Sequence, residues 1–263
     1  MTSKKQRLRA MEDAIKITTA KSDDDFLSEF VAKDSKGSSS SWAPTWHHPR
    51  TEAVYSLSLC QAQNTSEDDL EACFSLVQET SQQDYAASSR GWNPKSKRKE
   101  MREPDLRYIL VKDSSGQVRG YISLMPTMEE GEAVVYCYEI HLKPELRGTG
   151  LAGLLMGFLD EVASNIEVME KVMLTVFTCN TRAVKFYEHC GFEVDEISPR
   201  RRKLRNGIVK EPDYVIMSKR VERCQNGALN VAEQADLTAT PPAKMMKHEK
   251  ESLDVANQAT SKN

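Results

Sequence analysis

A short loop that leads into a helix carries residues suited to holding a pyrophosphate. Arg147, Gly150 and Ala152 fit the pattern (Arg/Gln)-x-x-Gly-x-(Gly/Ala). Small residues let backbone N–H groups approach an anion, and the start of the helix adds the positive end of its dipole. No Gly-Lys-Ser/Thr sequence follows, so the loop is not of the Walker type. The spacing predicts a pyrophosphate cradle, and the surrounding elements must decide which nucleotide it holds.

The apolar segment before this loop contains two tyrosines and a carboxylate. On a regular strand Tyr136 and Tyr138 share one face and Glu139 takes the other, unless a bulge intervenes. A carboxylate beside a cofactor loop suits a general base, acting directly or through a water. The alternatives are a salt-bridged structural carboxylate and tyrosines that merely pack in the core. A cysteine nucleophile is a weak hypothesis, because Cys137 lies in the same apolar segment with no paired base.

A second motif indicates the class of nucleotide. Residues 180–192 read Asn-Thr-Arg-Ala-Val-Lys-Phe-Tyr-Glu-His-Cys-Gly-Phe. With the loop, this run resembles the two signatures of the GNAT acetyltransferases, whose loop grips the pyrophosphate of acetyl-CoA. The resemblance implies acetyl-CoA as co-substrate and no metal, with Tyr187 close to the thioester sulfur. The cofactor-binding residues that we expect are Tyr138, Glu139, Ile140, Leu146, Arg147, Gly148, Thr149, Gly150, Leu151, Ala152 and Asn180.

Further segments are similar to the NatD-type histone-specific N-alpha-acetyltransferases of the GNAT superfamily. They are residues 136–139, 172–177 and 191–199, together with the Gly-Trp pair at 91–92 and the charged run after it. The resemblance implies transfer of acetyl to the N-terminal α-amine of histones two-A and four, whose tails begin Ser-Gly-Arg-Gly. It also implies a protein of the nucleus and the cytoplasm. Two alternatives stay open: a GNAT enzyme that acts on a lysine or a small amine, and a non-catalytic CoA-binding module.

The catalytic residues that we expect are Glu139, Tyr138 and Tyr187. Glu139 would be the general base, and one of the two tyrosines would protonate the leaving thiolate. An α-amine has a pKa of about 7.7–8.0, against about 10.4 for a lysine side chain, so a weak or water-relayed base would suffice. The substrate-binding residues implied by the resemblance are Tyr85, Glu129, Tyr136, Tyr138, Thr175 and Tyr214.

Recognition of the arginine at the third position of the peptide calls for acidic groups. Three glutamates lie within residues 129–132, just before the Tyr136 strand, and Glu129 is the strongest candidate among them. The alternative is an ordinary solvated turn. Thr127 and Met128 stand where relatives tend to carry an Asp, and Arg90 stands where relatives have an aromatic residue. One wall of the peptide site is therefore expected to differ.

The elements that position these residues are strands that are first antiparallel and then alternate with helices. This order predicts an α/β protein of GNAT fold, with a mixed, mostly antiparallel central sheet flanked by helices and an N-terminal helical extension. The domains expected are a basic helical segment (1–33), a flexible linker (34–50), a GNAT domain (51–222) and a disordered tail (223–263). Strands are predicted at 106–112, 118–126, 134–142, 171–177, 192–197 and 214–219, and helices at 4–30, from 66 onwards, at 151–162 and at 181–190.

The composition argues against several other classes of protein. The net charge of −3 disfavours nucleic-acid binding driven by bulk charge. The sequence contains no run of eighteen apolar residues, so no membrane span is predicted. Six cysteines without a CxxC pair indicate reduced thiols. The basic cluster near the N-terminus is either a nuclear address or a solvated face, and residues 200–205 are expected to form a solvated loop. A monomer is expected.

Overall fold

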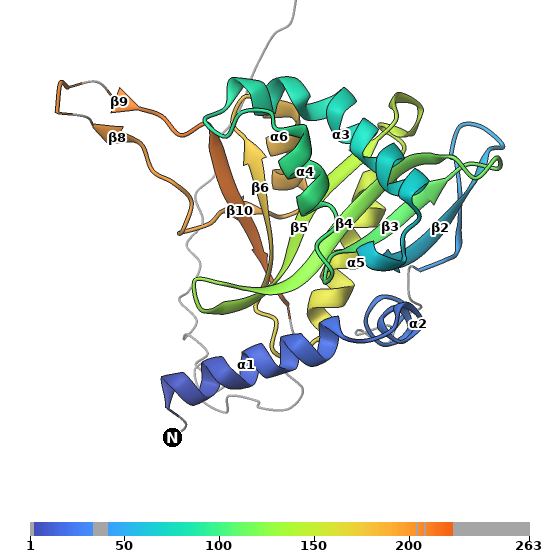
Figure 1. The fold of residues 1–263 in the computed structure, drawn as a ribbon, viewed down its shortest axis with the longest axis horizontal. Helices are drawn as coiled ribbons and strands as arrows, with labels where there is room; N and C mark the ends of the chain where they lie inside the picture. The colour runs from blue at the N-terminus through green and yellow to red at the C-terminus, as the bar shows by residue number, and fades with distance from the viewer. Residues whose placement is uncertain (1–2, 34–41, 204, 208, 223–263) are drawn as a thin grey trace, which may run out of the picture. The chain divides into compact units, whose positions relative to one another are not determined.

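A single mixed sheet forms the centre of the computed structural model, which describes residues 3–33, 42–203, 205–207 and 209–222. The strand order is β1-β2-β3-β4-β5-β6-β10-β7 (Figure 1). Neighbouring strands are antiparallel except β5 and β6, which are parallel. The predicted fold class is confirmed. The strands are β1 (Thr45–His47), β2 (Val54–Gln61), β3 (Arg107–Lys112), β4 (Val118–Glu129), β5 (Glu132–Leu142), β6 (Lys171–Phe177), β7 (Glu193–Val194) and β10 (Tyr214–Arg220), and β8 (Arg202–Lys203) pairs with β9 (Val209–Lys210) in a separate ribbon.

Helices cover both faces of the sheet (Figure 1). On one face lie α3 (Glu67–Ala87) and α4 (Pro94–Glu100), which contribute Phe74 and Met101 to one apolar cluster. The other face is covered by α5 (Leu151–Asn165), α6 (Thr181–His189) and the N-terminal helices, whose apolar residues form a second cluster. The N-terminal helices are α1 (Lys4–Thr19), α2 (Asp23–Phe26) and the π-helix η1 (Leu27–Val31), and two short 3-10 turns are η2 (Ala62–Asn64) and η3 (Pro144–Leu146).

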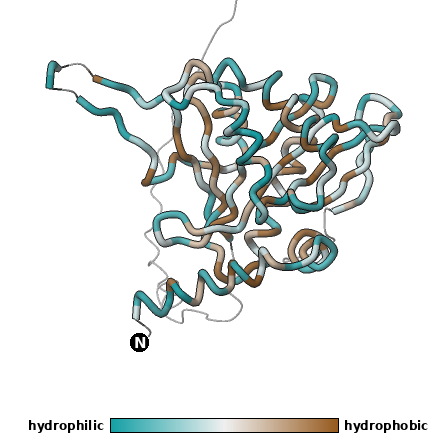
Figure 2. The backbone as a smooth tube through the Cα atoms, in the orientation of Figure 1, coloured by the Kyte–Doolittle hydropathy of each residue, from teal (hydrophilic) through white to brown (hydrophobic). Residues whose placement is uncertain are grey.

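The two apolar clusters follow from the alternation of side chains along the central strands. On β3, Ile109 and Val111 belong to the cluster under α5, whereas Tyr108 and Leu110 belong to the cluster under α3. A strand buried on both faces reads as a continuous apolar run, as β3 and β5 do. Figure 2 shows hydrophobic residues concentrated on the central strands, while the β8–β9 ribbon is mostly hydrophilic. The core therefore fixes β5, which carries Tyr136, Tyr138 and Glu139, in the middle of the sheet.

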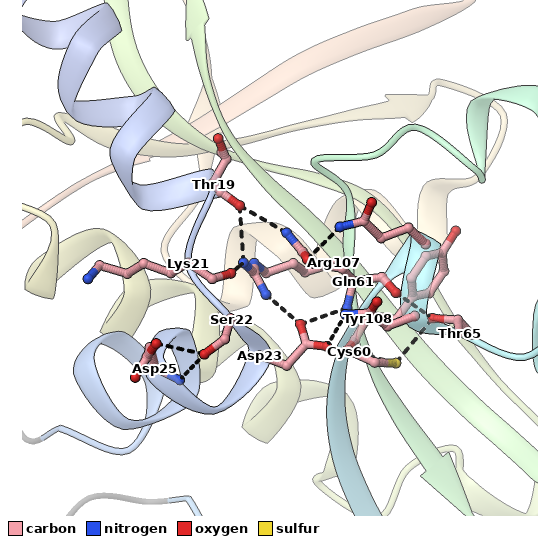
Figure 3. Close-up of polar contacts among 12 residues, drawn as sticks. Thr19, Lys21, Ser22, Asp23, Asp25, Cys60, Gln61, Thr65, Arg107 and Tyr108 are labelled. Carbon is pink, nitrogen blue, oxygen red and sulfur yellow. Dashed lines mark hydrogen bonds and ion pairs between the residues drawn. The ribbon is translucent and has the colours of Figure 1, made fainter.

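The prediction of one helix over residues 4–30 is wrong, because the helix breaks after Thr19 (Figure 3). The guanidinium of Arg107, on β3, donates hydrogen bonds to the carbonyl oxygens of Thr19 at 3.2 Å and Lys21 at 2.5 Å. It also pairs with the Asp23 carboxylate at 2.6 Å and stacks 4.2 Å from the ring centroid of Phe26. Carbonyls that bind Arg107 are turned out of the helix, so α1 ends here and α2 begins at a new cap. We call Arg107 with these four partners the N-terminal clasp.

Other boundaries also differ from the prediction. Residues 45–47 of the predicted linker form β1, which pairs with β2, so this part of the linker prediction is wrong. Residues 34–41 and the predicted tail, 223–263, lie outside the described residues. The predicted strand at 192–197 shortens to β7, because Asp195 turns to meet the buried Lys171 at 2.7 Å. The sequence analysis also missed β1, β2 and α4.

The described residues contain no helix long and apolar enough to cross a membrane. The five cysteines within the described residues are free thiols, as expected for reduced cysteines. They are Cys60, Cys73, Cys137, Cys179 and Cys190.

Candidate active site

A cavity of about 920 Å³ opens where β5 and β6 separate. The parallel pairing of these strands covers Val134–Cys137 on β5 and Lys171–Leu174 on β6. Beyond that point both strands continue, and their next residues line the cavity instead of pairing with each other. Main-chain amide and carbonyl groups of the two strands are therefore available to a ligand that enters the split. The remaining walls come from α3, from the loop before α5, and from α6.

A bulge on β5 sets which side chains face the cavity. Glu139 pairs with Ser123 and Cys137 with Leu124, so Tyr138 is an extra residue in the register. The bulge that the sequence analysis left open is therefore present, and it moves Glu139 to the face that also carries Tyr136. Without it, Glu139 would point into the cluster under α5. With it, the carboxylate meets residues of α3 and α4.

The predicted pyrophosphate loop has an open backbone. Gly148 and Gly150 have positive φ values of 68° and 88°, and each has free space where a Cβ would stand. Gly150 is the N-cap of α5, so the N–H groups of the first turn have no partner within the helix and face the loop; that of Leu151 donates to Thr149 Oγ1 at 3.4 Å. From the β1–β2 loop, Arg50 donates 3.4 Å hydrogen bonds to the carbonyls of Arg147 and Gly148. This arrangement fits a pyrophosphate held by main-chain amides.

Side chains of the predicted cofactor set take different places. Ile140, Arg147, Gly148, Gly150 and Ala152 line the cavity, as do Tyr138, Glu139 and Asn180. The side chains of Leu146 and Leu151 are buried in the core, so a cofactor contact from them would have to be through the main chain. Thr149 donates to the Leu146 carbonyl at 2.6 Å and is not among the lining residues.

Asn180 has a structural task besides any cofactor contact. Its side-chain oxygen accepts from the Ala183 amide at 3.1 Å and so caps α6. Its side-chain nitrogen donates to Asp84, on α3, at 3.4 Å. The side chain therefore joins two walls of the cavity. The role predicted for it in holding the cofactor arm stays a prediction.

Glu139 is the centre of a buried ion cluster. Lys97, on α4, forms an ion pair with it, and Tyr85, on α3, donates to the same carboxylate oxygen at 3.1 Å. His141 contacts the other oxygen through Nε2 at 2.5 Å. Lys97 also donates to Tyr85 at 2.9 Å and to Glu100 at 2.5 Å. Three elements thus meet at one carboxylate.

Nearby charges decide the ionisation of the Glu139 carboxyl. Burial alone would raise its pKa, but Lys97 and His141 outweigh burial and hold that pKa well below its ordinary value. An ionised carboxylate only accepts, so Nε2 of His141 donates to it. On the other side of the ring, Nδ1 of His141 lies 2.6 Å from Thr80 Oγ1.

Tyr138 and Tyr187 both line the cavity with neutral hydroxyls. Burial, with the nearby Glu100 as a smaller cause, raises the pKa of Tyr138 to about 12. Burial also raises the pKa of Tyr187 well above its ordinary value. Both phenols hold their proton near neutral pH and are suited to donate it. The choice between them stays open.

The predicted peptide-binding residues come together in part. Tyr136 and Tyr138 have ring centroids 5.3 Å apart, and Tyr136 hydrogen-bonds Thr175 across the split strands at 2.6 Å. Tyr85 packs edge-on against Phe177 at 4.9 Å. Tyr85, Tyr138 and Thr175 line the cavity, whereas Tyr136, Glu129 and Tyr214 are not among its lining residues.

Glu129 and Tyr214 lie on the neighbouring elements. Glu129 ends β4 at the β4–β5 turn, where burial and the adjacent Glu130 raise its pKa. Tyr214 begins β10 and stands opposite Phe177 in the register. Their contact with a peptide stays a prediction.

Lys97 and His141 are site residues that were not predicted from the sequence. Lys97 was hidden in a run of charged residues that looks like a solvated segment, although its side chain is 5% exposed. His141 follows Glu139 at the two-residue spacing of one strand face, and this spacing was a usable signal. Its ionic role depends on the bulge, which no local pattern announces.

Comparisons with known proteins agree with this geometry. Residues 67–192 match the model of the acetyltransferase (GNAT) family. The chain is 33% identical over 147 residues to N-alpha-acetyltransferase 40 of Saccharomyces cerevisiae, covering 47% of this chain and 51% of that protein. It is 28% identical over 106 residues to the L-amino acid N-acetyltransferase AaaT of Escherichia coli, covering 40% of this chain and 65% of that protein. The chain therefore spans between half and two thirds of these relatives.

A solved structure of Arabidopsis thaliana NAA60 with a bisubstrate analogue superposes with a TM-score of 0.47 at 13% identity, covering 64% of this chain and 100% of that chain. The two sequence signatures lie within the matched residues 67–192, and the mixed sheet agrees with them. Residues 67–192 are thus similar to the acetyltransferase (GNAT) family.

Proposed function

We propose that the protein is an N-alpha-acetyltransferase, which uses acetyl-CoA to acetylate the N-terminal α-amine of a polypeptide. One observation carries the proposal: a single cavity joins the open loop at residues 147–152, the split between β5 and β6, and the aromatic wall of Tyr85 and Tyr138. A cavity of this size lies within the range of small-molecule sites, which is about 300–1,000 Å³. Similarity to a yeast N-alpha-acetyltransferase supports the choice of an amine at a chain end.

The residues present fit acetyl-CoA. The amides at the start of α5 and around Gly148 and Gly150 would hold the pyrophosphate, and the unpaired main chain of β5 and β6 would hold the amide-bearing arm. When bound, acetyl-CoA supplies the thioester. Of the chain's own groups, the neutral hydroxyl of Tyr138 or Tyr187 would donate a proton to the leaving sulfur. The described residues contain no cluster of side chains arranged to hold a metal ion.

The substrates that we propose are the Ser-Gly-Arg-Gly tails of histones two-A and four, and the protein would act as a monomer in the nucleus and the cytoplasm. This part rests on the resemblance of residues 85–219 to the NatD-type enzymes. Glu129 would accept the third-position arginine. A charge-assisted hydrogen bond contributes roughly 1.5–3 kcal/mol, so replacing that arginine by alanine should weaken catalysis about ten- to more than a hundredfold, chiefly through binding.

A single pair of peptides tests the proposal. One begins Ser-Gly-Arg-Gly-Lys with a free α-amine, and the other is the same peptide with its α-amine blocked. We expect acetylation of the first and none of the second, measured by mass spectrometry. Equal acetylation of the blocked peptide would show that the acceptor is the lysine side chain and not the α-amine. The similarity to an L-amino acid N-acetyltransferase favours small amines as the second candidate, and free serine in the same assay addresses it.

A matched pair of glycine variants tests the cofactor loop. Gly150→Ala and Gly116→Ala place a Cβ on residues with φ values of 88° and 81°, and both have free space around them. The two variants therefore carry comparable backbone strain, roughly 1–3 kcal/mol. We expect weaker CoA binding in calorimetry for Gly150→Ala alone, because Gly116 lies in the β3–β4 turn. Equal CoA affinity in both variants would contradict the assignment of the loop.

A further inference from the structure

Two buried basic side chains beside the cavity have no part in the chemistry described so far. The side chains of Lys97 and His141 are 5% and 7% exposed, and both contact the Glu139 carboxylate, one at each oxygen. Tyr85 adds a third donor to this carboxylate. A general base must have a free lone pair and a pKa near the working pH. Glu139 fails the second condition, because its three donors stabilise the charged form and occupy most of its lone-pair positions.

We propose, building on the acetyltransferase function above, that Lys97 and His141 are positioning residues that keep Glu139 as an ionised, hydrogen-bonded carboxylate, and that the site therefore uses an amine that enters already uncharged. Glu139 then orients Tyr85, which forms part of the cavity wall. It does not take up the amine proton. The preference for one class of amine then follows from the pKa of the substrate amine and not from a base in the enzyme.

The reaction balances without an external base. The amine nitrogen forms a bond to the acetyl carbon, the carbon–sulfur bond breaks, and one proton passes from nitrogen to sulfur. Amine and thioester thus give amide and thiol, with no net proton gained or lost. A neutral phenol such as that of Tyr138 can pass on the proton. At pH 7.5 about a third of α-amines are uncharged, against about one in eight hundred lysine side chains, so ionisation alone favours the α-amine about 250-fold.

Several other ionisable groups face Glu139 from the elements around it. Those that contact the cluster directly are Lys97 and Glu100 on α4 and the imidazole of His141 on β5. The others are phenols and a thiol whose pKa values are raised, mainly by burial, so that they stay neutral near pH 7. These are Tyr85, Tyr108, Tyr121, Cys137 and Tyr187. Lys97 forms ion pairs with both Glu100 and Glu139, and His141 contacts Glu139.

The test is the pH dependence of kcat/KM between pH 5.5 and 9, with acetyl-CoA and the free Ser-Gly-Arg-Gly peptide. In the native enzyme we expect one bend, at the ionisation of the peptide amine. Lys97→Met should add a second bend at lower pH, where the released Glu139 becomes protonated, with at least a tenfold loss at pH 6 that narrows to about threefold at pH 8.5. Lys97→Arg should restore the native profile, and Glu139→Gln added to Lys97→Met should remove the second bend.

The control is Lys219→Met. It breaks a partly exposed ion pair between Lys219, on β10, and Asp160, on α5. It should keep the native profile. A native profile in well-folded Lys97→Met would make Lys97 merely structural and overturn the proposal. Faster turnover of Lys97→Met at pH 7 would also overturn it, since the released Glu139 would then be acting as a base.

Carbon-13 NMR of the glutamate carboxyls tests the same point without turnover. The Glu139 signal, identified by its loss in Glu139→Gln, should not titrate between pH 5 and 8 in the native protein and should titrate there in Lys97→Met. Titration in the native protein would refute the proposal. If the native enzyme acetylates no free peptide, the proposed function fails, while this measurement still decides the state of Glu139.

Discussion

Two buried cations in this protein, Arg107 and Lys97, have opposite surroundings. Arg107 is bound mostly by main-chain carbonyls of the N-terminal segment, and Asp23 is its carboxylate partner. The Lys97 ammonium contacts the side chains of Tyr85, Glu100 and Glu139, and two of these, Tyr85 and Glu139, line the cavity. Burial lowers the pKa of Arg107 despite Asp23, whereas around Lys97 the nearby carboxylates outweigh burial and raise the pKa.

The difference separates a cation that holds a segment from one that holds a charge. An arginine side chain stays protonated in proteins, so the role of Arg107 is to donate hydrogen bonds to the carbonyl groups at the break between α1 and α2. Lys97 sets the protonation of Glu139 and the position of Tyr85. Disrupting the N-terminal clasp should therefore reduce stability and spare turnover, whereas disrupting the cluster around Glu139 should change turnover and its pH dependence.

The largest effect is expected from Asp23→Ala. It leaves the Arg107 guanidinium buried without its carboxylate, which costs roughly 3–5 kcal/mol of unfolding free energy. Urea denaturation measures the loss, and kcat of the protein that remains folded should be unchanged. Asp24→Ala, at the exposed neighbouring position of α2, is the control and should have little effect. A large fall in kcat for folded Asp23→Ala would show that the clasp and the active site are coupled.

A second prediction concerns Glu139→Gln. This variant keeps the shape and removes the charge that Lys97 and His141 bind, so we expect kcat to fall about ten- to a hundredfold, the equivalent of one charged hydrogen-bonding group. Steady-state kinetics at pH 8 measures it. Loss of a general base typically removes about 10²–10⁴-fold. A fall at the upper end of that range would favour the base and weaken the contrast with the clasp.

The third prediction is the acid sensitivity of folding. The pKa of Glu139 is lower in the folded than in the unfolded state, so its contribution is present above the unfolded value, near 4.3, and is lost as pH falls towards the folded one. Between pH 7 and pH 3 the loss is at most about 2 kcal/mol. Glu139→Gln should remove that part of the acid limb in denaturation curves. An identical limb in both proteins would contradict the pKa direction.

The smallest effect is expected from Glu71→Gln. Arg98, on α4 beside Lys97, hydrogen-bonds the Glu71 carboxylate on α3 at 2.7 Å and stacks 3.6 Å from the centroid of the Phe74 ring. Exposed ion pairs contribute little because water screens them. The melting temperature and kcat should stay within experimental error. A clear loss of activity would mean that the exposed pair, and not the buried cluster, places Lys97.

Local patterns were enough to predict much of the site. The glycine-containing loop at 147–152 and the helix predicted at 181–190 are short-range features, and each was visible as residue types at a fixed spacing. The strands β3 to β6 were visible for the same reason, because a buried strand reads as an apolar run. The loop and the helix are also the two segments that carry the GNAT signatures.

Long-range contacts were decided by the tertiary structure alone. The partners of Glu139 lie up to 54 positions away on α3, and those of Arg107 up to 88 positions away on α1. The bulge at Tyr138 depends on the register between β4 and β5, which no residue of β5 specifies by itself. The sequence thus determined which residues could hold the cofactor, and tertiary packing decided that Glu139 would be an ion-paired carboxylate, because its charge state is set by groups that only the folded sheet and helices bring within hydrogen-bonding distance.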